Sequence, residues 1–139
     1  MEYKRIDNTI IARIDRGESI AEKIQKIATA ESIKAAQVSG IGAASHLEIG
    51  CYQVSEKQYI KHVYDGDFEI TSLLGNISQK DGEFYLHLHI NAADEKGTAY
   101  AGHFNEGIIG GTCELFINII DTTVERQYDD ETGLNVFKF

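Results

Sequence analysis

Three histidines in the second half of the chain have the types and spacing needed to bind a metal ion. His87 and His89 alternate with apolar residues in the run 84–90 (Phe-Tyr-Leu-His-Leu-His-Ile), and His103 follows fourteen residues after His89. Side chains in a β-strand alternate between two faces, so His87 and His89 share one face and the apolar residues form a row on the other. The spacing of the two histidines places their Cα atoms about 7 Å apart, close enough to share one ion.

The chain after this run predicts a hairpin. Residues 94–97 (Asp-Glu-Lys-Gly) indicate a turn, and residues 98–103 resume a strand pattern. With the turn centred in that segment, His103 falls opposite Leu88 or His89, ~5 Å away at Cβ. Three neutral imidazoles with an open fourth position are typical of a catalytic or ligand-accepting zinc site. A register shift of one residue would turn His103 to the other face, and a strand histidine is more often a surface or hydrogen-bonded residue.

The composition is that of an ordinary globular protein of one domain, residues 1–139, with 42% hydrophobic and 25% charged residues. Twenty-two acidic against thirteen basic residues give a net charge of −9, which argues against duplex DNA binding by the chain alone. Cys51 and Cys113 form no CxxC pair and are predicted to be buried thiols of a reducing compartment. Without a signal-peptide pattern or a membrane-spanning apolar run, we expect a cytoplasmic protein with no membrane partner.

The first third of the chain predicts a strand and a helix. Residues 9–14 are β-branched and alternate, which is typical of a strand. Ser19 and Glu22 fit a capping box, in which the hydroxyl and the carboxylate satisfy the first free amides of a helix over 19–31. Apolar residues follow at helical spacing, at Ile20, Ile24, Ile27 and Ala28.

A glycine-containing segment, 39–45 (Ser-Gly-Ile-Gly-Ala-Ala-Ser), follows a short predicted strand over 35–39. The dinucleotide-binding fingerprint needs three glycines that open a helix. Here there are two, and residues 47–52 alternate as a strand. We therefore predict a tight turn between two strands at this segment.

The rest of the chain is predicted to be almost entirely β-structure, which makes the domain α+β, a mostly antiparallel β-sheet with one main packed helix. The further strands are predicted at 58–64, 68–77, 84–90, 98–103, 112–121 and 134–139, with turns at 55–56, 65–67 and 80–82 and an acidic loop over 126–133.

Several motifs, in order along nearly the whole chain, resemble the PPC domain (plants and prokaryotes conserved). They are Asp15-Arg16-Gly17-Glu18, the segments 39–43 and 66–75, His87-Leu88-His89, Gly102-His103 and the segment 111–114. The resemblance implies a PPC-domain-like fold that assembles as a homotrimer. Plant members carry this domain beside AT-hook segments, and bacterial stand-alone members are often labelled DNA-binding. This sequence has no Arg-Gly-Arg core and no proline, so direct duplex DNA binding by the isolated chain is not expected.

His87, His89 and His103 also resemble the metal-binding strands of acetolactate decarboxylase, whose fold is similar to that of PPC domains. The resemblance implies a bound divalent metal. Zinc is the expected ion, with nickel, cobalt and iron as alternatives, because histidine nitrogen suits these ions better than magnesium or calcium.

Three other polar residues, Glu69, Glu114 and His46, are secondary candidates. Glu69 and Glu114 lie in the matching motifs and could support the metal ligands or act as general acid or base, although pairing with a base or with water is the favoured interpretation. His46 is a weaker candidate for the same pocket, and His62, in a strand flanked by lysine, is predicted to be exposed.

The main functional hypothesis is a trimeric metal-binding PPC domain that accepts a small ligand at the open coordination position. The first alternative is a metal-dependent lyase or hydrolase resembling acetolactate decarboxylase, which requires an acid or base near the metal. The second is an oligomerisation or interaction module for DNA-associated proteins, which requires only an exposed apolar patch.

Overall fold

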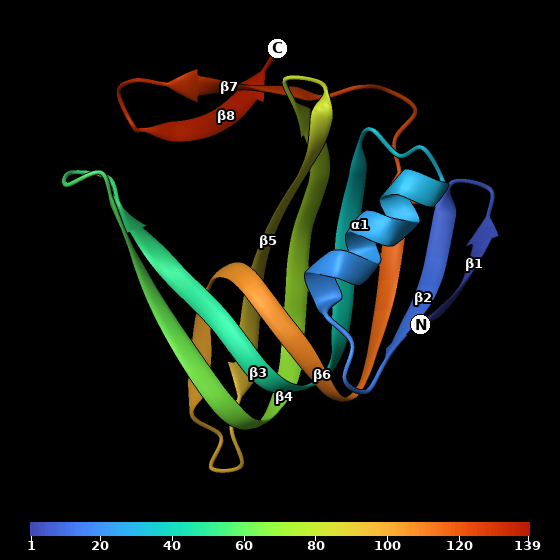
Figure 1. Cartoon of the computed structure of the whole chain (residues 1–139), viewed down its shortest axis with the longest axis vertical. Coiled ribbons are helices and arrows are strands. Elements are labelled where there is room, and N and C mark those ends of the chain that lie inside the picture. The colour runs from blue at the N-terminus through green and yellow to red at the C-terminus, as the bar shows by residue number, and fades with distance from the viewer.

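The computed structural model describes all 139 residues, most of them in one strongly curved β-sheet covered by a single helix (Figure 1). The strand order is β1-β2-β6-β3-β4-β7-β8, with β5 paired to both β4 and β6, and only the β4–β7 pair is parallel. This is the α+β, mostly antiparallel fold that the sequence predicts. The elements are β1 (Glu2–Ile6), β2 (Thr9–Asp15), α1 (Ile20–Ala30), β3 (Ala36–Gln53), β4 (Gln58–Lys80), β5 (Glu83–Ala93), β6 (Ala99–Ile119), β7 (Glu125–Asp129) and β8 (Leu134–Lys138).

The helix α1 begins after Ser19, whose hydroxyl accepts the backbone N–H of Glu22 at 3.1 Å. The second half of the predicted capping box is wrong, because the Glu22 carboxylate makes no hydrogen bond to the Ser19 N–H. The Ser19 hydroxyl also donates to the carboxylate of Glu106 in β6, at 2.9 Å. The cap thus ties the start of the helix to the sheet. The buried face of α1 is Ile20, Ile24, Ile27 and Ala28. No helix in the structure has the length and apolar character needed to cross a membrane.

The three longest strands, β3, β4 and β6, bend near their middles, so that the sheet has two arms (Figure 1). One arm carries α1 and the main apolar core, and the other carries the free ends of β3 and β4. Register shifts in β3 fall between Gly40 and Gly42 and between Ala44 and His46, and such bulges bend a strand and increase its twist. In Figure 1, β5 and the first half of β6 lie between the two arms.

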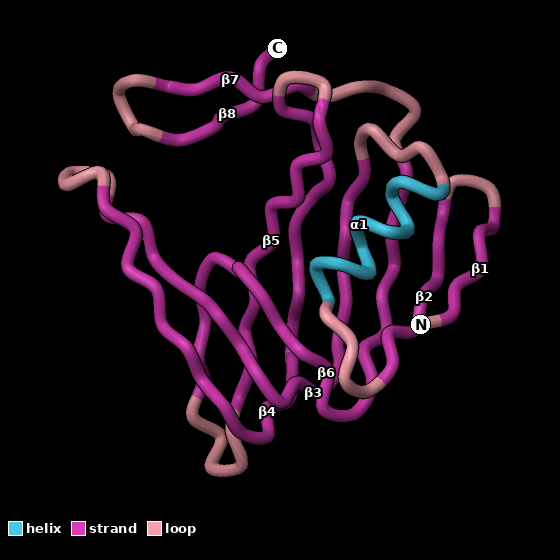
Figure 2. Tube along the Cα trace, viewed as in Figure 1, coloured by secondary structure: helices cyan, strands magenta, loops and turns pink.

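The predicted turn over residues 39–45 is wrong, because these residues lie inside β3 (Figure 2). Gly42 pairs with Cys113 of β6, and a Cβ at Gly42 would overlap the Thr112 carbonyl oxygen and lie 2.7 Å from the Cα of Cys113. The glycine is therefore required by a close approach of two strands and not by a reversal of the chain. The turn predicted at 65–67 is likewise part of a strand, β4, where Gly66 has φ +148°.

The ends of the chain also differ from the prediction. Residues 2–6 form β1, an edge strand that the sequence analysis did not identify. The predicted loop 126–133 contains most of β7, which forms a hairpin with β8. The Asp129 carboxylate accepts the backbone N–H and the hydroxyl of Thr132, and Gly133 has φ +76°, so side-chain hydrogen bonds close this turn.

Replacing Gly42 by Ala should destabilise the fold by about 1–3 kcal/mol, because the new methyl group must displace β6. The measurement is urea unfolding followed by circular dichroism. Gln37→Ala, at an exposed position of the same strand, is the control and should change the free energy of unfolding by less than about 0.5 kcal/mol. Equal stability of the two variants would mean that β3 and β6 are not in close contact at Gly42.

Candidate metal centre

The β5–β6 hairpin fixes which histidines face one another. The Asp94 carboxylate accepts the backbone N–H groups of Lys96 and Thr98 at 2.9 and 2.8 Å, and the Asp94 N–H donates to the Thr98 carbonyl. These bonds hold the pKa of Asp94 below its usual value, chiefly because Thr98 donates to the carboxylate. The closed turn pairs Ala93 with Ala99 and therefore His89 with His103, one of the two registers predicted from the sequence.

The imidazoles of His87, His89 and His103 meet on the face of the sheet opposite the core. One ligand atom from each lies within 4.8 Å of the others, and the ring centroids are 5.1 to 5.6 Å apart. Tetrahedral zinc with Zn–N bonds of about 2.1 Å holds its nitrogens about 3.4 Å apart. Movements of about an ångström would bring the three rings to that geometry, so the donor set fits a zinc-like ion with a fourth position open.

The surroundings of the cluster keep two of its imidazoles uncharged. Burial lowers the pKa of His87 to about 4, helped by the neighbouring His103, Arg126 and His89. Burial also lowers the pKa of His103, with His89 as the second cause. Neutral imidazole is the form that binds a metal, so these two side chains are ready to act as ligands at neutral pH.

A cavity of about 870 Å³ lies in front of the histidines. Aromatic and aliphatic side chains form much of its wall, and none of its sixteen lining residues is Asp or Glu, although the chain has 22 acidic residues. Its walls come from both sheet arms and from the C-terminal hairpin: Gly50–Tyr52 of β3, Tyr59 and Asn76 of β4, Tyr85, His87 and His89 of β5, Ala101–His103 of β6, Arg126 of β7 and Leu134–Phe137 of β8.

Tyr59 forms one side of the cavity, beside the three-histidine cluster. Its ring meets that of His103 edge to face with centroids 5.9 Å apart, and its hydroxyl donates to Asn105. A Cβ at Gly50, the residue paired with His103, would overlap the Tyr59 ring. Glycine at this position therefore lets the tyrosine lie across β3 and cover His103.

Arg126 is a cavity residue that the sequence did not predict, because a single arginine in an acidic segment gives no periodic signal. It is only 7% exposed, and its guanidinium lies between the rings of Tyr85 and Phe137, at 4.6 and 4.4 Å from their centroids. The guanidinium donates to Ser78, to Asn76 and to the Asn135 carbonyl, at 2.7 to 2.9 Å. It therefore anchors the β7–β8 hairpin over the cavity.

The secondary candidates lie elsewhere. His46 is 2.7 Å from the Asp65 carboxylate and is not part of the three-histidine cluster. His62 is exposed, as predicted, and stacks on Tyr64. Glu69 and Glu114 are both exposed and neither lines the cavity.

The two thiols differ in environment. Cys113 is buried as predicted, and burial raises its pKa to about 12. The prediction for Cys51 is wrong, because Cys51 is exposed and lines the cavity. Ile49 of β3 is buried in the core. Cys51 lies two residues further along the strand and is exposed, because the free end of β3 extends beyond the core into solvent.

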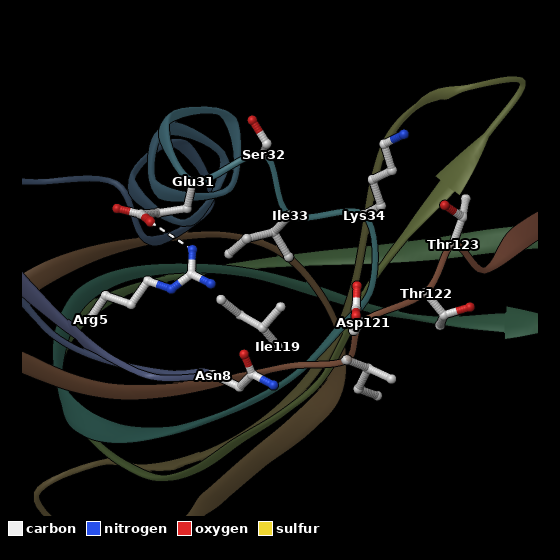
Figure 3. Close-up of a pocket in the computed structure, with 11 residues that line it drawn as sticks. Arg5, Asn8, Glu31, Ser32, Ile33, Lys34, Ile119, Asp121, Thr122 and Thr123 are labelled. Carbon is white, nitrogen blue, oxygen red and sulfur yellow. Dashed lines mark hydrogen bonds and ion pairs between the residues drawn. The ribbon is translucent and has the colours of Figure 1, made fainter.

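A second hollow, of about 570 Å³, lies beside the end of α1 (Figure 3). Its arginine, Arg5, pairs with the Glu31 carboxylate at 3.1 Å, so the charge already has an acidic partner. No cluster of metal-ligand atoms occurs there. The three-histidine cavity is therefore the stronger candidate for a functional site.

The structure thus combines a curved antiparallel sheet, one packed helix and a histidine cluster on the outer face of the sheet. The sequence profile of the Plants and Prokaryotes Conserved (PCC) domain matches residues 1–121, and the chain belongs to this family. The PPC resemblance stated from the sequence is thereby confirmed. A comparison with curated proteins gives no match.

Two solved structures are similar to this chain in both sequence and fold, and a third is similar in fold alone. The chain is 30% identical to a candidate DNA-binding protein from Bacteroides thetaiotaomicron, with a TM-score of 0.96 over 99% of this chain and 96% of the other. It is also 30% identical to a metal-containing protein from Archaeoglobus fulgidus, with a TM-score of 0.89 over 99% and 97% of the two chains. Acetolactate decarboxylase from Bacillus subtilis shares the fold alone, at 16% identity and a TM-score of 0.58 over 84% of this chain and 54% of the enzyme.

A thiol reagent added to the native protein should modify one cysteine per chain, because Cys51 is exposed and Cys113 is buried with a raised pKa. Both should react after unfolding in guanidinium chloride. Cys51→Ser should abolish the native reaction, and Cys113→Ser should leave it intact. Two reactive thiols in the folded wild type would contradict this assignment.

Proposed function

We propose that the protein binds one divalent transition-metal ion through His87, His89 and His103 and holds a small ligand at the open coordination position. The observation that carries the proposal is the approach of three imidazole ligand atoms within 4.8 Å at the wall of a large cavity. Zinc is the first choice for such a nitrogen donor set. The metal-containing relative from Archaeoglobus fulgidus supports a metal site in this fold but does not identify the ion.

The residues around the cluster favour ligand binding over a purely structural ion. A structural zinc site uses four protein ligands, and this group supplies three.

The enzyme alternative, a metal-dependent lyase or hydrolase, needs an acid or base near the ion. No carboxylate lines the cavity, so its titratable groups besides the histidines and Arg126 are tyrosines and Cys51. This composition makes a binding protein the better supported function.

The DNA-binding label of the Bacteroides relative has less support in this chain. A net charge of −9 repels phosphate on average, and duplex binding depends on Lys and Arg neutralising phosphates. An interaction module for DNA-associated proteins remains the second candidate, because an exposed apolar patch is present on the sheet. The cytoplasmic location expected from the sequence stays a prediction.

Purified protein grown with added zinc should contain one metal ion per chain, measured by elemental analysis. His89→Ala should lose the metal and keep the circular dichroism spectrum, because His89 is exposed and the apolar row of β5 on the other face forms the core. His62→Ala is the matched control, a histidine on an exposed strand outside the cluster, and should retain full metal content. Metal-free wild type, or a His89→Ala variant with full metal content, would disprove the proposal.

We also propose the homotrimer implied by the family resemblance. A row of paired residues crosses the outer face of the sheet: Ile11 pairs with Phe116, Phe116 with Ser39, Ser39 with Leu74, and Leu74 with His89. The exposed fractions of the three apolar members, Ile11, Phe116 and Leu74, are 42, 47 and 53%. Such a cross-strand patch is typical of a subunit interface, since assembly would remove it from water.

Sedimentation equilibrium at micromolar concentration should give three times the chain mass of 15.5 kDa. Phe116→Asp should shift the distribution towards monomer, because it places a charge in the centre of the patch. Val54→Asp, a similarly exposed apolar position at the free end of the β3–β4 hairpin, should leave the trimer intact. A monomeric wild type would remove this proposal.

A further inference from the structure

Arg126 is the only charged residue among the buried residues of the protein. Its three hydrogen-bond partners, Ser78, Asn76 and the Asn135 carbonyl, are all neutral, and no carboxylate lies within ion-pair distance of it. A guanidinium has five N–H donors, so two remain after these bonds, one on each terminal nitrogen. A buried charge without a counter-ion is costly, even when aromatic rings face it.

Arg5 offers a contrast within the same chain. It is more exposed than Arg126 and has its own acidic partner, Glu31, at 3.1 Å (Figure 3). The exposed Arg5, which water could solvate, thus has an acidic partner. The buried Arg126 has none. Anchoring the β7–β8 hairpin accounts for three of the donors of Arg126. It does not account for a positive charge facing a cavity without acids.

Arg126 is also close to the metal cluster. Its guanidinium stacks on Tyr85, which is two residues before His87 on the same face of β5 and hence about 7 Å away at Cα. Its Nη2 group bonds to Asn76, the residue that pairs with His87 across the β4–β5 ladder. A guanidinium and a divalent ion would therefore share one cavity at a separation that a short molecule can span.

We infer that the cavity binds a small organic carboxylate, with the carboxylate on Arg126 and a second donor atom of the same molecule at the open position of the metal. The inference rests on the proposed metal site. A planar carboxylate accepts two parallel N–H bonds from a guanidinium, and such charge-assisted bonds are shorter and stronger than neutral ones. The aromatic and aliphatic walls, including Phe137, suit the carbon chain of this ligand.

The test uses cobalt(II)-loaded full-length protein in a Cys51→Ser background, where the exposed protein thiol cannot compete. The probes are 3-mercaptopropionate and its neutral amide, 3-mercaptopropionamide. Both present the same thiol to the metal, and thiolate-to-cobalt absorption reports binding. The acid should bind about 10- to 100-fold more tightly than the amide, the range expected for a hydrogen-bonded ion pair. Arg126→Gln should reduce this ratio to about one while the cobalt content stays the same, because Arg126 is not one of the proposed metal ligands.

Arg5→Gln is the matched control and should keep the full preference for the acid, because it removes the same charge outside the cavity. Equal affinities of the acid and the amide for the wild-type cavity would overturn the carboxylate inference while leaving the metal site standing, whether or not Arg126→Gln folds well. A preference that persists in Arg126→Gln would also overturn it. Failure to take up cobalt would instead remove the proposed metal site, and the carboxylate inference with it.

Discussion

The candidate centre depends on the register of one hairpin. Side chains on a strand alternate with a period of two, so a slip of a single residue between β5 and β6 would send His103 to the core face and leave two histidines without the third. The turn prevents this slip by giving the Asp94 carboxylate two backbone partners within four residues. The local geometry of a short polar segment thus determines whether side chains fourteen residues apart can share an ion.

The second requirement is the bending of the long strands. A flat sheet would present the three imidazoles on an open surface. The bulges in β3 and the close contact at Gly42 curve the sheet, and the free ends of β3 and β4 and the β7–β8 hairpin then surround the histidine face. The cavity therefore follows from backbone features distant from the cluster.

The sequence predicted those parts of the molecule that local periodicity governs. The alternation around His87 and His89, the polar turn at 94–97 and the apolar spacing of α1 each lie within a dozen residues, and the structure has all three. The glycines at 40 and 42 were misread because their cause is a strand more than seventy residues away. Arg126 and Cys51 were missed or misassigned for a related reason: burial and exposure at the ends of strands depend on which other segments fold over them, and no spacing rule encodes that.

The row of paired residues from Ile11 to His89 makes the apolar patch and the metal face parts of one continuous surface. Leu74 and His89 are direct cross-strand partners, so their side chains leave the sheet about 5 Å apart. A subunit packed on Leu74 would touch the surroundings of a metal ligand, and an ion on His89 would stiffen a residue at the edge of the subunit contact. Assembly and metal uptake then become linked equilibria: whatever factor metal adds to the association constant, association must add to the affinity for metal. In the proposed metal-binding trimer, the contact between these two side chains on adjacent strands would let the supply of metal influence the oligomeric state.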